Sequence, residues 1–258
     1  MENKTALTVD HYLFSGKTIS EICILTFKKT PLLHIADLEA KEVLFNYLEH
    51  ISCHDQTKIL LIKNASVKMD RTEYIRYYLK MIESGGDLML LERMFSAINQ
   101  FILKLVGLNK LVIHADSGNV ILLYMNISLA CDYRIVADNT VYQNPNVELN
   151  MAPKGGGVFF LSKMLGTAIA SRLLLSNEEI PALEAHQLGI IDKVVPLKDL
   201  DRVALETAQS YARLPSGYAI GIKRLLNFGI KELECCLEYE NRLLRRQAHS
   251  CHNVWKLK

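Results

Sequence analysis

One lysine stands among neighbours that suggest chemistry. Lys154 follows Pro153 and precedes three consecutive glycines that begin at Gly155. The proline restricts the path of the chain, and the glycines let the backbone pass close to a ligand. Ala152 and Val158 suggest an apolar setting, which favours a neutral amine that can act as a base. The alternatives are a solvated lysine, or one that contacts a phosphate at a glycine-rich turn.

Few other side chains suggest a reaction. His114 and Asp116 come at the end of a strand candidate, where a single histidine is usually a satisfied structural group. The six cysteines show no framework spacing, and the adjacent pair at 235 and 236 is typical of two thiols on a helix. We therefore expect reduced thiols and no metal site.

Composition limits the classes of function. The 258 residues include 30 basic and 28 acidic side chains, a balance that gives no field for binding nucleic acid. The longest nearly apolar run, 120–130, contains Asn126 and Ser128 and is shorter than the roughly 20 residues of a membrane span. The N-terminus does not resemble a secretion signal. These features predict a cytoplasmic protein without membrane contact.

The hydrophobic pattern alternates between strands and helices. Strands are expected over 19–27, 58–62, 111–115, 133–137 and 140–142, and helices over 37–51, 88–105 and 121–131. The run 58–62 is continuously apolar, as in a strand buried on both faces. The apolar stripe of 88–105 is expected in the core. Strands and helices in this order predict stacked α/β units.

A longer motif resembles a known family. Ser128 to Ala137 reads SLACDYRIVA, two prolines follow eight residues apart at 145 and 153, and 182–196 reads ALEAHQLGIIDKVVP. In these residues the chain resembles the crotonase superfamily, the enoyl-CoA hydratase and isomerase group. The resemblance is specific over about 110–230.

The resemblance implies an α/β fold and a substrate class. Members form a spiral of repeated ββα units, expected here over 1–196, with a C-terminal helical trimerisation region, expected over 197–258. They bind acyl thioesters on coenzyme A or a carrier protein. The implied assembly is a homotrimer or a dimer of trimers, and coenzyme A enters only as part of the substrate, with no separate cofactor.

The sequence departs from the family at its reactive positions. The two glutamates of the hydratases fall on Asn126 and Asn146, and an amide does not exchange a proton near neutral pH. The glycine triplet falls on 122–124, so the thioester-binding N–H of Leu123 is crowded. Met69 is the candidate for the second N–H donor. The implied site is therefore Lys154, Asn126 and Asn146 for catalysis, with Leu123, Met69 and Gly155 for binding the thioester.

Three hypotheses remain open on the sequence alone. The chain is a divergent enzyme that stabilises an enolate for isomerisation, decarboxylation or hydrolysis. Alternatively, it is an inactive pseudoenzyme that acts as a binding or assembly subunit. The third hypothesis is a small-molecule enzyme that no longer uses coenzyme A. Hydration by paired carboxylates is not expected under any of them.

Overall fold

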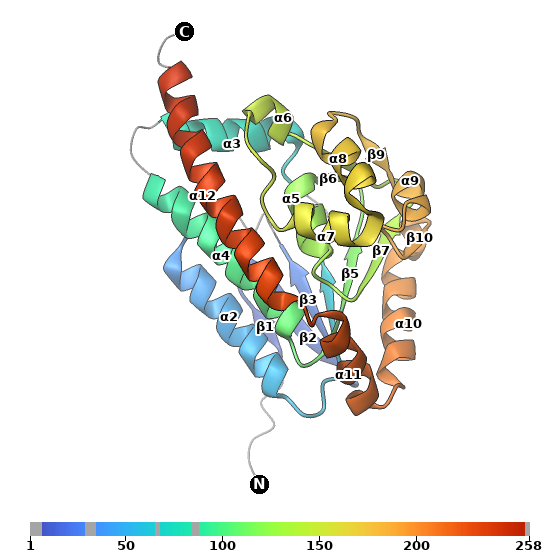
Figure 1. Cartoon of the computed structure of the whole chain (residues 1–258). Coiled ribbons are helices and arrows are strands. Elements are labelled where there is room, and N and C mark those ends of the chain that lie inside the picture. The colour runs from blue at the N-terminus through green and yellow to red at the C-terminus, as the bar shows by residue number, and fades with distance from the viewer. Residues whose placement is uncertain (1–6, 29–34, 65–67, 84–87, 256–258) are drawn as a thin grey trace.

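A mostly parallel β-sheet forms the centre of the molecule (Figure 1). The computed structural model describes residues 7–28, 35–64, 68–83 and 88–255. Within them the seven-stranded sheet has the order β1-β2-β3-β4-β5-β7-β10. Its strands are β1 (Val9–Asp10), β2 (Phe14–Ile19), β3 (Ile22–Phe27), β4 (Ile59–Lys63), β5 (Leu111–Asp116), β7 (Tyr133–Ala137) and β10 (Lys193–Val195).

The first strands form an antiparallel hairpin, and the sheet is parallel from β3 onward. Ile59 to Ile62 of β4 are all buried, as the continuous apolar run predicted. A second sheet pairs β6 (Asn119–Ile121), β8 (Val141–Gln143) and β9 (Ile180–Pro181). In the consecutive pairs β5-β6 and β7-β8, the first strand therefore lies in the main sheet and the second strand lies in the second sheet. This arrangement confirms the repeated ββα plan.

Helices cover both faces of the main sheet. On one face α10 (Leu200–Ala212) packs through Ala204, Ala208 and Ala212, whose small side chains let the helix lie close to the strands. On the other face lie α2 (Leu38–Cys53) and α4 (Leu88–Gly107). The stripe expected in the core is buried along α4: Leu91, Phe95, Ile98, Phe101 and Leu105.

Shorter helices and one long helix complete the fold. They are α3 (Arg71–Glu83), α5 (Leu122–Ser128), α6 (Asn146–Leu149), α7 (Gly157–Leu165), α8 (Thr167–Leu175), α9 (Ala182–Gln187), the 3₁₀ helix η1 (Leu197–Asp199), α11 (Ser216–Leu226) and α12 (Ile230–Trp255). In Figure 1 α12 runs alongside α4. No described helix is both long and apolar enough to cross a membrane.

Two sequence predictions can be compared directly with the N-terminal elements. The helix expected over 37–51 is confirmed, with Asp37 accepting a bond from Ala40 N at 3.0 Å as its N-cap. The strand expected over 19–27 is confirmed over 22–27 as β3, but it starts later than expected, because a turn at Ser20, with φ of 54°, separates it from β2. Gly16 interrupts the alternation of apolar and polar residues in β2, so the sequence pattern does not reveal this strand. The absence of a side chain at Gly16 makes room for Tyr47.

The C-terminal region, expected over 197–258 to form the trimer contact, buries much of its apolar surface internally. Leu233, Leu237 and Leu244 are buried within this chain. They lie on α12, which packs on α4 and α3. Leu225 and Leu226 remain exposed. The described cysteines are free thiols, and the division at residue 196 stays a prediction.

Candidate active site

The segment after Pro153 makes a tight turn against α5. Gly155 and Gly156 have φ of 104° and 73°, values that favour glycine, and α7 begins at Gly157. A Cβ on Gly155 would lie 3.1 Å from Asn126 Cβ, and one on Gly157 would lie 2.4 Å from Asn126 Oδ1. These glycines therefore allow the turn to pack onto Asn126 itself.

Asn126 connects α5 to this turn. Its side chain is fully buried, and its Nδ2 donates to the carbonyl oxygen of Lys154 at 2.9 Å. Its Oδ1 has no hydrogen-bond partner among the described residues. The position that the resemblance aligned with a hydratase acid thus holds an amide that bonds to the protein's own backbone.

Lys154 is held inside the molecule by an ion pair. The residue is 2% exposed, and its ammonium donates to Asn99 Oδ1 and, at 3.2 Å, to Glu240 Oε2. Glu240 also accepts bonds from the backbone N–H groups of Gly155 and Gly156, each at 3.0 Å. Lys154 is therefore not solvated, and its contacts are polar rather than the apolar ones suggested by its sequence neighbours.

The pair is strongly perturbed by burial. Burial lowers the pKa of Lys154, while the nearby Glu240 carboxylate opposes that shift. Burial raises the pKa of Glu240, and the lysine and the two glycine N–H groups oppose it. Each member thus compensates for the cost of burying the other, so removing either one alone leaves an unfavourable group inside the protein.

Helix α12 holds the turn at a second point. Gln247 Oε1 accepts a bond from Ala152 N at 2.9 Å. Asn99 Nδ2, on α4, donates to the carbonyl oxygen of Leu237 at 3.1 Å. Through Glu240 and Gln247 the C-terminal helix therefore fixes the segment from Ala152 to Gly156.

The role of Glu240 was not predicted from the sequence. A signal existed, because Glu240 continues the buried stripe of α12 formed by Leu233, Leu237, Leu244 and Ala248. A carboxylate on the apolar face of an amphipathic helix requires a buried partner. The pattern did not show which cation that would be.

The other predicted acid position lies in a separate set of bonds. Asn146 is buried, and its Nδ2 donates to Asn144 Oδ1 at 3.0 Å. Asn144 in turn donates to the carbonyl oxygens of Leu174 and Ser176. The carboxylate nearest to Asn146 in the sequence, that of Glu148, is exposed and pairs with Arg71. Asn146 therefore stabilises the loop before α6, while Asn126 bonds to the turn at Lys154.

The predicted thioester donors are crowded. Leu123 lies in the first turn of α5, whose N-cap Ile121 supplies no side-chain acceptor. Its side chain is 2% exposed, and its Cδ1 would lie 3.4 Å from a Cβ on Gly155. Met69 is half-buried against the core, and residues 65–67 of the same loop lie outside the described residues. Leu123 is thus buried against the turn at Gly155.

Comparisons with known proteins identify relatives of this chain. The family model for enoyl-CoA hydratase/isomerase matches residues 92–250. The chain belongs to the enoyl-CoA hydratase/isomerase family. A crotonyl-CoA hydratase of Syntrophomonas wolfei is 30% identical over 129 residues, 47% of this chain and 50% of that protein. A trans-2-decenoyl-[acyl-carrier-protein] isomerase of Streptococcus mutans is 28% identical over 153 residues, 59% and 58% of the two chains.

The match spans about half the length of these curated relatives. Solved structures extend the likeness in fold. An enoyl-CoA hydratase from Bacillus halodurans has a TM-score of 0.78 at 17% identity, covering 92% of this chain and 95% of that one. An enoyl-CoA hydratase/isomerase structure from Acinetobacter baumannii has a TM-score of 0.77 at 17% identity, covering 96% and 99%. The crotonase fold expected from the sequence is confirmed.

A second polar cluster lies at the carboxyl ends of β4 and β5 in this family member. Asn64 Nδ2 donates to Asp116 Oδ2 at 2.6 Å and lies 3.2 Å from His114 Nε2. Lys68 pairs with Asp116. Because the amide nitrogen is a donor, His114 Nε2 accepts, and the ring is neutral. Burial lowers the pKa of His114 to about 4.

The cavity beside this cluster is small. Asn64, His114 and Tyr124 line it together with apolar side chains, and it offers about 10 Å³ to the centre of a water-sized sphere. That is room for about one water molecule. The Tyr124 hydroxyl is buried and lacks a partner among the described residues. An acyl chain does not fit in this conformation.

His114 predicts an acid-sensitive component of stability. Its folded-state pKa of about 4 lies below the unfolded value of 6.5, so the unfolded chain binds the proton first as pH falls. The neutral His114 therefore makes its full contribution to the free energy of unfolding above about pH 6.5. About 3 kcal/mol of this contribution is lost progressively as the pH falls towards 4. Urea unfolding from pH 7 to 4 should show a shallower decline for His114→Gln than for wild type. Equal slopes would contradict a neutral buried histidine.

Proposed function

We propose that this chain is a catalytically silent member of the enoyl-CoA hydratase/isomerase family that works as a binding or assembly subunit. The observation that carries the proposal is the closure of the family site by internal bonds. Asn126 is engaged with the Lys154 carbonyl, and Lys154 is paired with Glu240. A group already committed to a buried partner is not free to exchange protons with a substrate.

The space needed for substrate supports the same conclusion. An enolate oxygen needs preorganised N–H donors that reach it at about 3 Å. Here the side chains of Leu122, Leu123 and Tyr124 are buried where the hydratases carry glycines. Binding an acyl thioester at this point would require these side chains and the turn at Gly155 to move.

The surface of α11 supports an assembly role. Its outward side chains and those just after it form an exposed apolar face: Tyr218, Ile222, Leu225, Leu226 and Phe228. Phe228 is 88% exposed. We propose a second copy of this chain as the partner, in a homotrimer or a dimer of trimers in the cytoplasm. Covering contiguous apolar side chains removes their contact with water.

The assembly proposal predicts a measurable mass. Light scattering after size exclusion is expected to give a multiple of 29.3 kDa at micromolar concentration. Replacing two exposed apolar side chains, as in Leu225→Ser with Phe228→Ser, should weaken association at least about tenfold, since each buried large side chain contributes about 1.5–3 kcal/mol. Tyr12→Ser, at an exposed aromatic far along the chain, serves as the control. A wild-type monomer would contradict the proposal.

A second candidate function rests on the buried pair. Lys154 and Glu240 are two perturbed titratable groups beside Asn126, and such pairs also occur where enzymes move protons. In this candidate the pair transfers protons on an enolised acyl thioester, for isomerisation, decarboxylation or hydrolysis, once α12 has moved. The relative from Streptococcus mutans, a trans-2-decenoyl-[acyl-carrier-protein] isomerase, is compatible with this candidate.

A further inference from the structure

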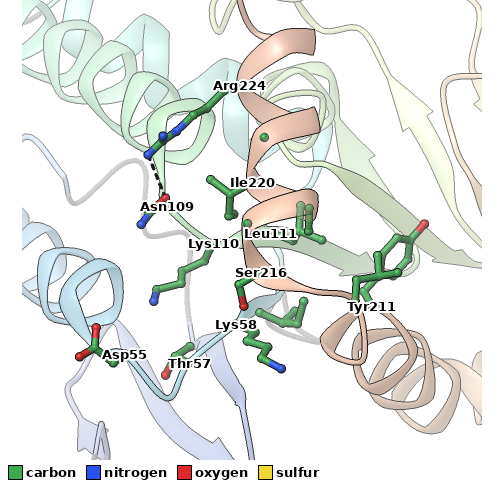
Figure 2. Close-up of a pocket in the computed structure, with 15 residues that line it drawn as sticks. Asp55, Thr57, Lys58, Asn109, Lys110, Leu111, Tyr211, Ser216, Ile220 and Arg224 are labelled. Atoms are coloured by element: carbon green, nitrogen blue, oxygen red, sulfur yellow. Dashed lines mark hydrogen bonds between the residues drawn. The ribbon is translucent and has the colours of Figure 1, made fainter.

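An open pocket lies where strands β4 and β5 begin, at the opposite ends of these strands from Asn64 and His114 (Figure 2). Its volume is about 360 Å³, within the usual range for small-molecule sites. It is lined by the first residues of the two strands, Ile59 and Leu111, and by α11. This pocket is far larger than the one-water cavity beside Asn64 and His114.

Two cationic side chains that line the pocket, Lys110 and Arg224, have N–H donors left for further hydrogen bonds. Lys110 is 7% exposed, and its Nζ donates to the carbonyl oxygen of His54 at 2.9 Å. Arg224 donates to Asn109 Oδ1 at 3.2 Å. An ammonium has three N–H bonds and a guanidinium has five, so these contacts leave others available. Figure 2 shows Lys110 reaching across the pocket from the start of β5.

The charges in the pocket favour an anion. Lys58 is already paired with Glu21 at 2.8 Å. Asp55 lies on the same side as Lys110, and one carboxylate does not balance two cations. Burial lowers the pKa of Lys110 and Asp55 opposes that shift. An anionic group between Lys110 and Arg224 would restore favourable contacts to both.

The rest of the pocket has space for an apolar body. A Cβ on Gly217 or on Gly221 would meet nothing within 4 Å, so both glycines of α11 border open space. Leu111 and Ile220 lie between the polar groups in Figure 2. Apolar surface beside a few placed donors is the usual make-up of a small-molecule site.

We propose that this pocket binds a small organic anion, a phosphate or carboxylate group carried on an apolar body. The anion lies between Lys110 and Arg224, and the apolar body lies on Leu111 and Ile220 beside Gly221. This proposal goes beyond the assembly role and does not depend on the family site being silent.

Calorimetric titration with phenyl phosphate and with benzoate, at fixed ionic strength, tests the proposal. We expect saturable binding of at least one probe with a Kd of about 1 mM or tighter, and the stronger probe identifies the preferred anion. Arg224→Gln should weaken that binding about tenfold, through loss of a charge-assisted contact. The matched control is Arg213→Gln, an exposed arginine outside the pocket lining, which should leave Kd unchanged.

A cavity-filling variant gives an independent measurement. Gly221→Leu adds a side chain where a Cβ would meet nothing within 4 Å, and it improves helix propensity. It should abolish binding of both probes while the thermal midpoint stays equal or rises. Failure of both probes to bind wild type up to about 10 mM would overturn the proposal. Equal affinity in wild type, Gly221→Leu and Arg224→Gln would also overturn it.

Discussion

Purified protein is expected to hydrate crotonyl-CoA at no more than about 10⁻³ per second. Acid–base groups typically contribute about 10²–10⁴-fold each, and amides occupy both positions, Asn126 and Asn146. Starting from a typical turnover of about 10 per second, losing both leaves at least a 10⁴-fold deficit. Loss of the conjugated enoyl absorbance, followed in a spectrophotometer, measures this rate directly.

Restoring the two acids should not restore the reaction. In the double variant Asn126→Glu with Asn146→Glu, the new carboxylate at 126 replaces a donor to the Lys154 carbonyl and sits against Gly157. Leu122, Leu123 and Tyr124 also remain buried beside this position. A single variant at Asn146 is the control for a general loss of folding. Turnover near 10 per second in the double variant would show that crowding at 122–124 does not block the site.

The variant Lys154→Met is expected to lower the free energy of unfolding by about 3–5 kcal/mol. The substitution leaves Glu240 charged, buried and short of its cation, which is the costly outcome for a buried pair. Glu240→Gln should cost a similar amount by leaving Lys154 unpaired. The double variant should cost less than the sum of the two, because neither charge is then left alone. Urea unfolding at pH 7 gives all three values.

A matched control lies on α12, the helix that carries Glu240. Arg245 on α12 pairs with Glu92 on α4 at 2.7 Å, with both side chains about half exposed. Exposed pairs contribute about 0–1 kcal/mol, so Arg245→Gln should have a small effect. If Lys154→Met were as mild as Arg245→Gln, the buried pair would not be what holds the turn to α12.

Local pattern predicted much of the fold. The helix capped by Asp37 follows from its apolar period and from its cap, and β4 follows from its continuous apolar run. Both elements are determined by residues that are close together in the sequence, so a local pattern is enough to predict them. The strand split at Ser20 was missed because Gly16 interrupts the alternation, and the reason for that glycine, Tyr47, lies 31 residues away.

The sequence indicated candidate residues but not the bonds that hold them. The family spacing pointed to Asn126, Asn146 and Lys154, and the structure brings Asn126 to Lys154 but leaves Asn146, the first residue of α6, bonded to Asn144. The decisive residue, Glu240, comes from a helix 86 residues after Lys154. A pairing of that kind depends on tertiary packing of α12, which no local pattern specifies.

The central claim is that the family site does not form an enolate on an acyl thioester. An isomerisation through an enolate removes a proton from the carbon next to the thioester, and a decarboxylation through an enolate adds one there, so proton exchange at this carbon in deuterated water tests for a stabilised enolate. Proton NMR of butyryl-CoA with the protein should show exchange at the rate of buffer alone. Exchange well above that rate, lost in Lys154→Met or Glu240→Gln and retained in Arg245→Gln, would contradict the claim and establish the buried pair as catalytic.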